Sequence, residues 1–167
     1  MADGRVAVCP GSYDPVTNGH LDVIGRAARV FDRVVVGVVD VQVRKQAPLF
    51  NAEERKRMLQ QALDTNGHDN VEVKVFSNLL VDFARENGAV AIVKGLRAIS
   101  DFEYEFEMNQ LNRKLAGDIE SVYIFASAEY SFIRSTGVKE MATFGGDVSD
   151  LVPGHVAEAL AQRLSDQ

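Results

Sequence analysis

Residues 6–20 read VAVCPGSYDPVTNGH: a short apolar run, a loop of small and turn-forming residues, and the start of a helical pattern. A strand that runs through such a loop straight into a helix brings backbone N–H groups and the helix N-terminus up to a bound anion. His20 falls in the first helical turn, where its ring N–H and the positive end of the helix dipole can face one phosphate oxygen. Taken alone, the last four residues also fit an ordinary capped helix with a surface histidine. Their place directly after a strand favours a phosphate site.

The same rhythm of apolar run and helical segment continues along the chain, and none of the runs alternates strictly as a half-exposed strand does. The pattern predicts an α/β fold: a Rossmann-like, doubly wound sheet of five parallel strands, in a single domain over residues 1–167 with a C-terminal helix. The expected strands are Val6–Cys9, Val34–Val39, Val71–Val75, Ala89–Val93 and Ser121–Phe125. The expected helices begin near Gly19, Asn51, Leu79, Asp101 and Ser135, and a last one covers Pro153–Leu164. Asn51, with Glu54 three residues on, is a good capping pair.

Composition narrows the possible partners. A chain of 167 residues can bury a core as one compact domain without disulfides or metals. The formal net charge of −6 argues against a broad basic surface, and so against nucleic acid or a membrane as partner. The single cysteine, Cys9, lies in an apolar run and is expected in the core rather than as a reactive thiol. Residues 1–5 hold no apolar signal region and no run is long enough to span a membrane, so we expect a cytoplasmic protein.

Two further loops should meet the first one, because ligands of open α/β sheets bind beyond the carboxyl ends of the strands. After the fourth expected strand, two cations flank a glycine in Lys94-Gly95-Leu96-Arg97, a group that suits a phosphate chain. The acidic helix that follows carries Asp101 and Glu105 on one face; they are solvated acids, or they orient Arg97 or accept from a ribose.

After the fifth strand, hydroxyls gather where a helix begins, in the stretch Tyr130–Thr136. Ser135 and Thr136 can cap that helix and also bind phosphate oxygens. An ordinary cap does not explain the flanking cations Arg134 and Lys139. Since the chain holds no Walker-type or G-x-G-x-x-G motif, the three loops predict a polyphosphate site of another kind. A substrate phosphate can itself attack an α-phosphorus in line, so no protein nucleophile is needed.

These motifs resemble the phosphopantetheine adenylyltransferases, within the nucleotidyltransferases that carry a T/H-x-G-H signature. The similarity covers nearly the whole chain and is most specific in residues 10–20, 94–105 and 130–140. It implies that ATP, with Mg²⁺ carried on it, reacts with 4'-phosphopantetheine to give dephospho-coenzyme A and pyrophosphate. This is the penultimate step of coenzyme A biosynthesis, by direct in-line attack without a covalent enzyme intermediate. It also implies a homohexamer, and coenzyme A is a candidate feedback ligand.

The resemblance also assigns roles to residues and gives the protein itself no metal ligand. His20 would hold the pentavalent α-phosphate and is the main catalytic candidate, Ser12 would touch both substrates, and Tyr13 would lie against ATP. Lys94 would bind the pantetheine phosphate and Leu80 the pantetheine arm. The remaining ATP-binding set is Gly95, Leu96, Arg97, Glu105, Tyr130, Ser131, Phe132, Ile133, Arg134, Ser135 and Thr136.

Two stretches depart from the family pattern, residues 40–50 and residues 134–137. The loop over residues 40–50 looks longer by a residue or two, so the cation facing the reacting phosphates is Arg44 or Lys45; side-chain chemistry favours Lys45, a gapless alignment Arg44. Arg134 replaces a serine, and either adds a bidentate phosphate contact or crowds the triphosphate. Gly137 replaces a larger residue and should weaken its helix by roughly 1 kcal/mol relative to alanine.

Two rival functions fit part of the pattern. A sister enzyme could use the same sheet on nicotinamide mononucleotide, or on glycerol phosphate with CTP. A regulatory module that only senses ATP is the rival from another class, but it would not need Lys94 together with Arg44 or Lys45 on the acceptor side.

Overall fold

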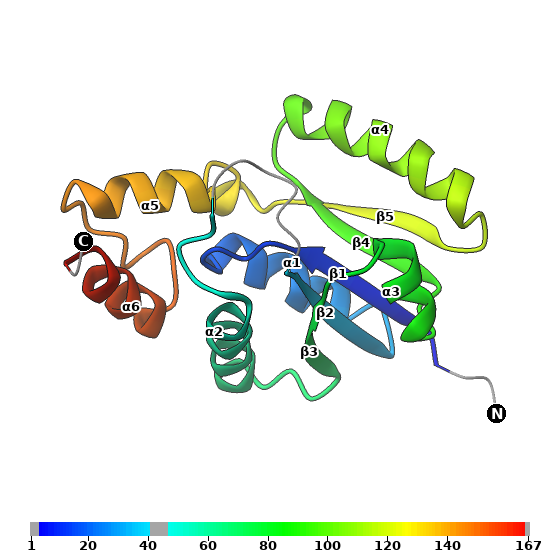
Figure 1. The fold of residues 1–167 in the computed structure, drawn as a ribbon, viewed down its shortest axis with the longest axis horizontal. Helices are drawn as coiled ribbons and strands as arrows, with labels where there is room; N and C mark the ends of the chain where they lie inside the picture. The colour runs from blue at the N-terminus through cyan, green and yellow to red at the C-terminus, as the bar shows by residue number, and fades with distance from the viewer. Residues whose placement is uncertain (1–3, 41–46, 166–167) are drawn as a thin grey trace.

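The computed structural model describes residues 4–40 and 47–165, which form an α/β protein built on a parallel sheet of five strands (Figure 1). The strands are β1 (Val6–Gly11), β2 (Arg33–Val39), β3 (Val71–Phe76), β4 (Ala91–Leu96) and β5 (Glu120–Phe125). The helices are α1 (Asn18–Ala28), α2 (Ala52–Thr65), α3 (Leu80–Glu86), α4 (Ile99–Leu115), α5 (Ser135–Thr143) and α6 (Gly154–Ser165), with a short 3₁₀ turn at Ala128–Tyr130. The expected fold class is thereby confirmed.

Alternate residues of the strands feed two separate hydrophobic layers, one on each face of the sheet. Val8 and Val35, paired in register, belong to the layer that contains Phe83 of α3. Their neighbours Cys9 and Val36 belong to the other layer, with side chains of α1, α2, α5 and α6. Because both faces are covered, both sets of alternating positions are apolar, which explains the uninterrupted valine runs in the sequence.

The strand order is β3-β2-β1-β4-β5, so the chain reverses its direction of travel between β1 and β4. Ligands of such sheets bind at this point, beyond the carboxyl ends of the two strands. Here β1 is followed by the loop over residues 12–17, and β4 by the turn into α4.

Most of the expected elements are found, with shifts at their ends. Asn51 and Glu54 form the expected capping box at the start of α2. Cys9 is 2% exposed, and burial raises the pKa of its thiol to about 12, so the core assignment is confirmed. The largest shift is in the fourth strand: Lys94, Gly95 and Leu96 pair with β5 and form the last part of β4, not a loop beyond it.

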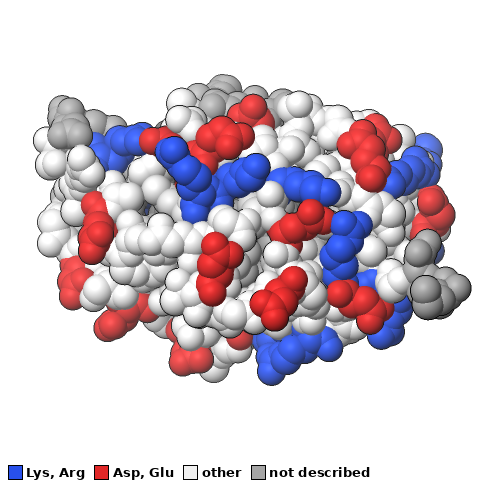
Figure 2. Space-filling view, turned by 90° about the horizontal axis from the view of Figure 1, so that it is seen from below, with Lys and Arg blue, Asp and Glu red and all other residues white. Residues whose placement is uncertain are grey.

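Charged side chains of both signs lie on the surface, as expected for a chain with a formal net charge of −6. Figure 2 shows one face of the molecule, on which Lys and Arg side chains are interspersed with Asp and Glu. Among the residues that the structure describes, no helix has the length and apolar character of a membrane span.

Candidate active site

A cavity of about 340 Å³ opens where β1 and β4 separate. A volume in this range suits a small-molecule ligand. Nine of the residues expected at the site line it: Ser12, Tyr13, His20, Lys94, Gly95, Arg97, Glu105, Tyr130 and Ile133. The expected residues outside its lining are Leu80, Leu96, Ser131, Phe132, Arg134, Ser135 and Thr136. Arg44 and Lys45 fall outside the residues that the structure describes, so the choice between them stays open.

Tyr13 is a buried residue of the loop after β1 that contacts both Cys9 and His20. Its backbone has φ of 49°, in the left-handed region that non-glycine residues rarely adopt, and its side chain is only 5% exposed. The hydroxyl donates to the carbonyl of Cys9 at 2.9 Å, and the ring stands edge-on to His20 with 5.0 Å between ring centroids. A Cβ on Gly11 would lie 2.9 Å from this ring, so the close approach requires glycine there.

His20 is oriented by the end of its own helix. Thr17 is the N-cap of α1: its hydroxyl accepts from the backbone N–H of His20, and its own backbone N–H donates to Nδ1 of the ring at 3.0 Å. Burial, and secondly the positive charge of Arg97, lower the pKa of the imidazole to about 4. At neutral pH the ring is therefore uncharged, and because Nδ1 accepts, the ring proton sits on Nε2. His20 can act as a neutral hydrogen-bond donor.

The two cations at the end of β4 are each held by a carboxylate of α4. Nζ of Lys94 lies 2.8 Å from Glu105, and Nε of Arg97 lies 3.1 Å from Asp101. Arg97 also donates to the carbonyl of Ile133 at 2.9 Å. The expectation that an α4 acid orients Arg97 is correct for Asp101, whereas Glu105 orients Lys94.

The start of α5 differs from expectation. Ser135 does not cap the helix, which begins without a side-chain cap; its hydroxyl donates to the carbonyl of Pro15 at 2.8 Å. The physical reason is that the N-cap position belongs to Arg134, whose side chain has no acceptor. The Arg134 guanidinium is 53% exposed and lies 4.0 Å from Asp101, so it stands close to Arg97 at the edge of the site.

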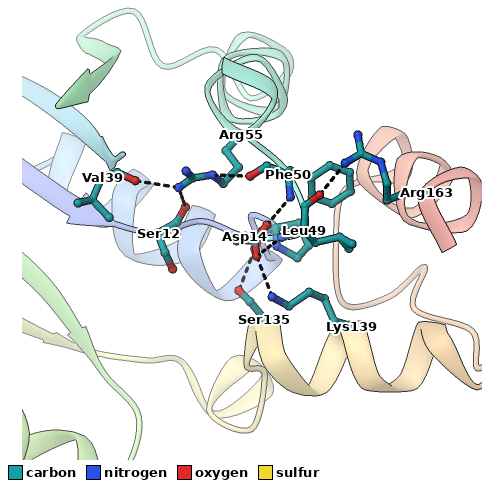
Figure 3. A network of polar contacts seen from close by, with 10 residues as sticks. Ser12, Asp14, Val39, Leu49, Phe50, Arg55, Ser135, Lys139 and Arg163 are labelled. Carbon is teal, nitrogen blue, oxygen red and sulfur yellow. Dashed lines mark hydrogen bonds and ion pairs between the residues drawn. The ribbon is translucent and has the colours of Figure 1, made fainter. Parts of the chain in front are cut away.

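Three polar residues that the sequence did not single out for this role join the loops behind the cavity (Figure 3). They are Asp14, Arg55 and Lys139. The sequence held one sign of this network: Arg55 is a charged residue on the apolar stripe of α2, beside Leu59 and Leu63. A buried charge must be paired, and its presence on a buried stripe points to a specific set of partners.

Comparison with known proteins gives this geometry a context. Residues 8–141 match the sequence model of the family described as Cytidylyltransferase-like. A phosphopantetheine adenylyltransferase of Thermomicrobium roseum is 52% identical over 159 residues, covering 95% of this chain and 94% of the relative. One of Rubrobacter xylanophilus is 51% identical over 161 residues, covering 96% of each chain.

The structural neighbours agree on the fold. A bifunctional NMN adenylyltransferase/ADP ribose pyrophosphatase from Francisella tularensis superimposes with a TM-score of 0.72 at 16% identity, covering 99% of this chain and 51% of that chain. At that identity the likeness concerns the fold alone. The full-length identity near 50% is far more specific, and by it the chain belongs to the phosphopantetheine adenylyltransferase family, within the cytidylyltransferase-like proteins.

Proposed function

We propose that the protein transfers the adenylyl group of ATP to 4'-phosphopantetheine, giving dephospho-coenzyme A and pyrophosphate, the penultimate step of coenzyme A biosynthesis. The observation that carries this proposal is the cavity at the β1–β4 junction, where neutral His20 meets the cations Lys94 and Arg97. Identity of about half the residues to relatives with that name supports the choice of acceptor.

The reaction is a single displacement. An oxygen of the pantetheine phosphate forms a bond to the α-phosphorus of ATP while the bond from that phosphorus to the pyrophosphate oxygen breaks. Lys94 holds the attacking phosphate, and Nε2–H of His20 donates to the α-phosphate oxygens as negative charge gathers on them. A neutral donor aimed at developing charge needs no proton transfer, so its contribution is electrostatic positioning. Arg97, kept in place by Asp101, faces the nucleotide phosphates.

Mg²⁺ enters this scheme with ATP. In the described part of the chain, no three side chains of His, Cys, Asp or Glu lie together as a metal site. Mg²⁺ keeps several waters and is usually bound through substrate phosphates. It would neutralise phosphate charge there, while the protein orients the phosphates through Arg97 and His20.

The family resemblance further suggests a homohexamer, and α4 supports an assembled state. None of its residues is buried, although several are large and apolar. These are Ile99, Phe102, Phe106, Leu111 and Leu115, each between 51% and 82% exposed. Figure 1 shows α4 along one side of the molecule beside β5, where Phe125 is a further exposed apolar residue. Large exposed apolar side chains gathered on one helix are typical of protein interfaces.

Three smaller proposals accompany the main one. The whole chain, residues 1–167, acts as one nucleotidyltransferase domain. The enzyme works in the cytoplasm, without nucleic acid or membrane as partner. Coenzyme A, which shares the pantetheine arm and the adenylyl group with the product, is proposed to compete for the same cavity.

Pyrophosphate release from ATP and Mg²⁺ tests the main proposal, measured with 4'-phosphopantetheine, nicotinamide mononucleotide or no acceptor, and with CTP plus glycerol phosphate. We expect release only with ATP and 4'-phosphopantetheine, and dephospho-coenzyme A by mass spectrometry. Turnover of another acceptor alone would assign the chain to a sister activity. ATP binding without release in any mixture would support a sensor.

A further inference from the structure

The guanidinium of Arg55 joins three separate parts of the chain behind the cavity. It donates from Nε to the carbonyl of Phe50 at 2.9 Å, and from Nη1 to the carbonyls of Ser12 at 2.6 Å and Val39 at 3.0 Å. Arg55 is 2% exposed, so these bonds are made away from water. Because a guanidinium is a rigid planar fork, one side chain sets the spacing of all three carbonyls.

Asp14 makes a second connection between the same segments. Its Oδ1 accepts from the backbone N–H of Phe50 and its Oδ2 from that of Leu49, both at 2.9 Å. Nζ of Lys139, from α5, pairs with Oδ2 at 2.8 Å. Figure 3 shows the carboxylate between these groups, with Arg55 on the other side of Phe50. Through Arg55 and Asp14 the loop after β1 is tied to the entry of α2, and through Lys139 and Ser135 it is tied to α5.

The bonds of Arg55 and Asp14 hold residues that border the cavity, although neither side chain lines it. Ser12 lines the cavity with its neighbour Tyr13, whereas Arg55 and Asp14 do not. Val39 and Phe50 stand at the two ends of the segment that contains Arg44 and Lys45 in the sequence. Two other lining residues, Lys94 and Arg97, are held by Glu105 and Asp101 of α4, and none of their bonds within the described part of the chain involves Arg55 or Asp14.

We propose that Arg55 and Asp14 are positioning residues for adenylyl transfer, an inference that rests on the proposed function. They hold Ser12 and both ends of the Val39–Phe50 segment at the separation that the reacting phosphates require, and they touch neither substrate. Misplacement of one wall of an active site by about 1 Å can lower a rate by on the order of 100-fold. ATP affinity should change much less, because the contacts on the β4 and β5 side of the cavity remain.

Arg55→Lys is the sharpest test, with Arg163→Lys as its matched control. Lysine keeps the charge, but its three donors sit on one nitrogen at the end of a flexible stem, so they cannot reproduce the planar fork that spans these carbonyls. Arg163, on α6, is an arginine that contacts the same segment from outside: it donates to the carbonyl of Leu49 at 2.6 Å, pairs with Glu54 and lies over the ring of Phe50. It has no bond to the loop after β1, so its loss should affect stability without changing the loop spacing.

The measurements are single-turnover rates of dephospho-coenzyme A formation, and the stoichiometry and Kd of ATP binding by calorimetry, each on protein checked for folding by circular dichroism. For Arg55→Lys we expect the single-turnover rate to fall by on the order of 100-fold. The stoichiometry should be unchanged and the Kd should shift by less than about threefold, which is under 1 kcal/mol. Arg163→Lys should keep the wild-type rate. Turnover by the wild type tests the proposed function separately. The ratio of the variant rate to the wild-type rate therefore tests the positioning role alone.

Two results would overturn the proposal: a rate in Arg55→Lys equal to that of the wild type, or a loss of rate matched by an equal loss of ATP-binding sites, which means loss of folded protein. Asp14→Asn is the second variant in case Arg55→Lys does not fold. It keeps the side-chain shape but presents an amide N–H₂ to a backbone N–H, and should reproduce the same split between rate and ATP affinity.

Discussion

The backbone N–H of Thr17 donates to Nδ1 of His20 at 3.0 Å, which fixes both the tautomer and the direction of the catalytic candidate. With its pKa lowered to about 4, mainly by burial, His20 stays neutral over the physiological range. We expect NMR of the imidazole nitrogens to show the Nε2–H form between about pH 5 and 8, with titration near pH 4, in contrast to a free histidine near 6.5. The missing signal in His20→Gln would assign it.

The lowered pKa of His20 also makes the free energy of unfolding depend on pH. A histidine whose pKa is lower in the folded than in the unfolded state stabilises the fold above the unfolded value, and this contribution is lost as pH falls toward the folded value. The wild type should therefore lose stability between pH 6.5 and about 4 more steeply than His20→Gln, as measured by urea unfolding. Equal pH dependence in both proteins would contradict the buried neutral state.

Replacing His20 by alanine should separate chemistry from binding. Its donor acts on charge that develops at the α-phosphate, so kcat should fall by about 100- to 1,000-fold, as for other donors of this kind. The Kd for ATP should be nearly unchanged. An unchanged kcat would remove His20 from the mechanism.

Lys94→Ala should raise the KM for 4'-phosphopantetheine by about 10-fold or more, the size of a lost charge-assisted hydrogen bond. ATP binding should be little affected, because Arg97 keeps its own partner Asp101. The control is Lys114→Ala, in the exposed last turn of the same helix α4 that holds Glu105. If Lys94→Ala weakens both ligands equally, the Lys94–Glu105 pair is structural rather than a substrate contact.

Gly137 gives a test of stability alone. It lies inside α5, and a Cβ there would meet no atom within 4 Å, so Gly137→Ala should stabilise the protein by about 0.5–1 kcal/mol. In a chain of this size, that corresponds to a Tm increase of roughly 2–4 °C per kcal/mol. Gly145→Ala is the opposite control: its φ of 75° is left-handed, and alanine there should cost about 1–2 kcal/mol. A destabilised Gly137→Ala would show that the site is crowded in the assembled protein.

The exposed face of α4 can be tested by charge. Leu111→Glu should shift the assembly to smaller species in light scattering, because a carboxylate opposite an apolar partner is costly to bury. Val30→Glu is close in exposure, 55% against 51% for Leu111, but it precedes β2, on the side of β1 away from β5. It should leave the mass unchanged. A mass unaffected by Leu111→Glu would exclude α4 as the interface.

The parts of the molecule governed by local patterns were predictable from sequence. The valine runs predicted the strands because burial on both faces leaves no room for alternation, and Asn51 with Glu54 predicted the start of α2 because a capping box is local. The meeting of three loops followed from one rule of parallel sheets.

Long-range partners account for what sequence reasoning missed. The hydroxyl of Ser135 bonds to Pro15, 120 residues earlier, and Arg55 bonds to Ser12, 43 residues earlier; neither partner is visible in a local motif. Gly95 was expected only as part of the ATP-binding set, but a Cβ there would lie 2.9 Å from Val23, so glycine also lets β4 pack on α1. Lys94 was expected beyond the strand because a cation at the end of a buried strand is read as a loop residue.

The strand order also determines when the site can exist during synthesis. β1 is made first but occupies the centre of the sheet, and its β4 edge has no partner until Ala91 and Ile92 have been made. Tyr130 and Ile133 also line the cavity, so the proposed nucleotide site is incomplete until β5 and the next turn have left the ribosome. In the interval the apolar edge of β1 is open to wrong pairing, a known hazard of parallel sheets. Nucleotide binding in this cavity would therefore report that β1, β4 and the segment after β5 have come together.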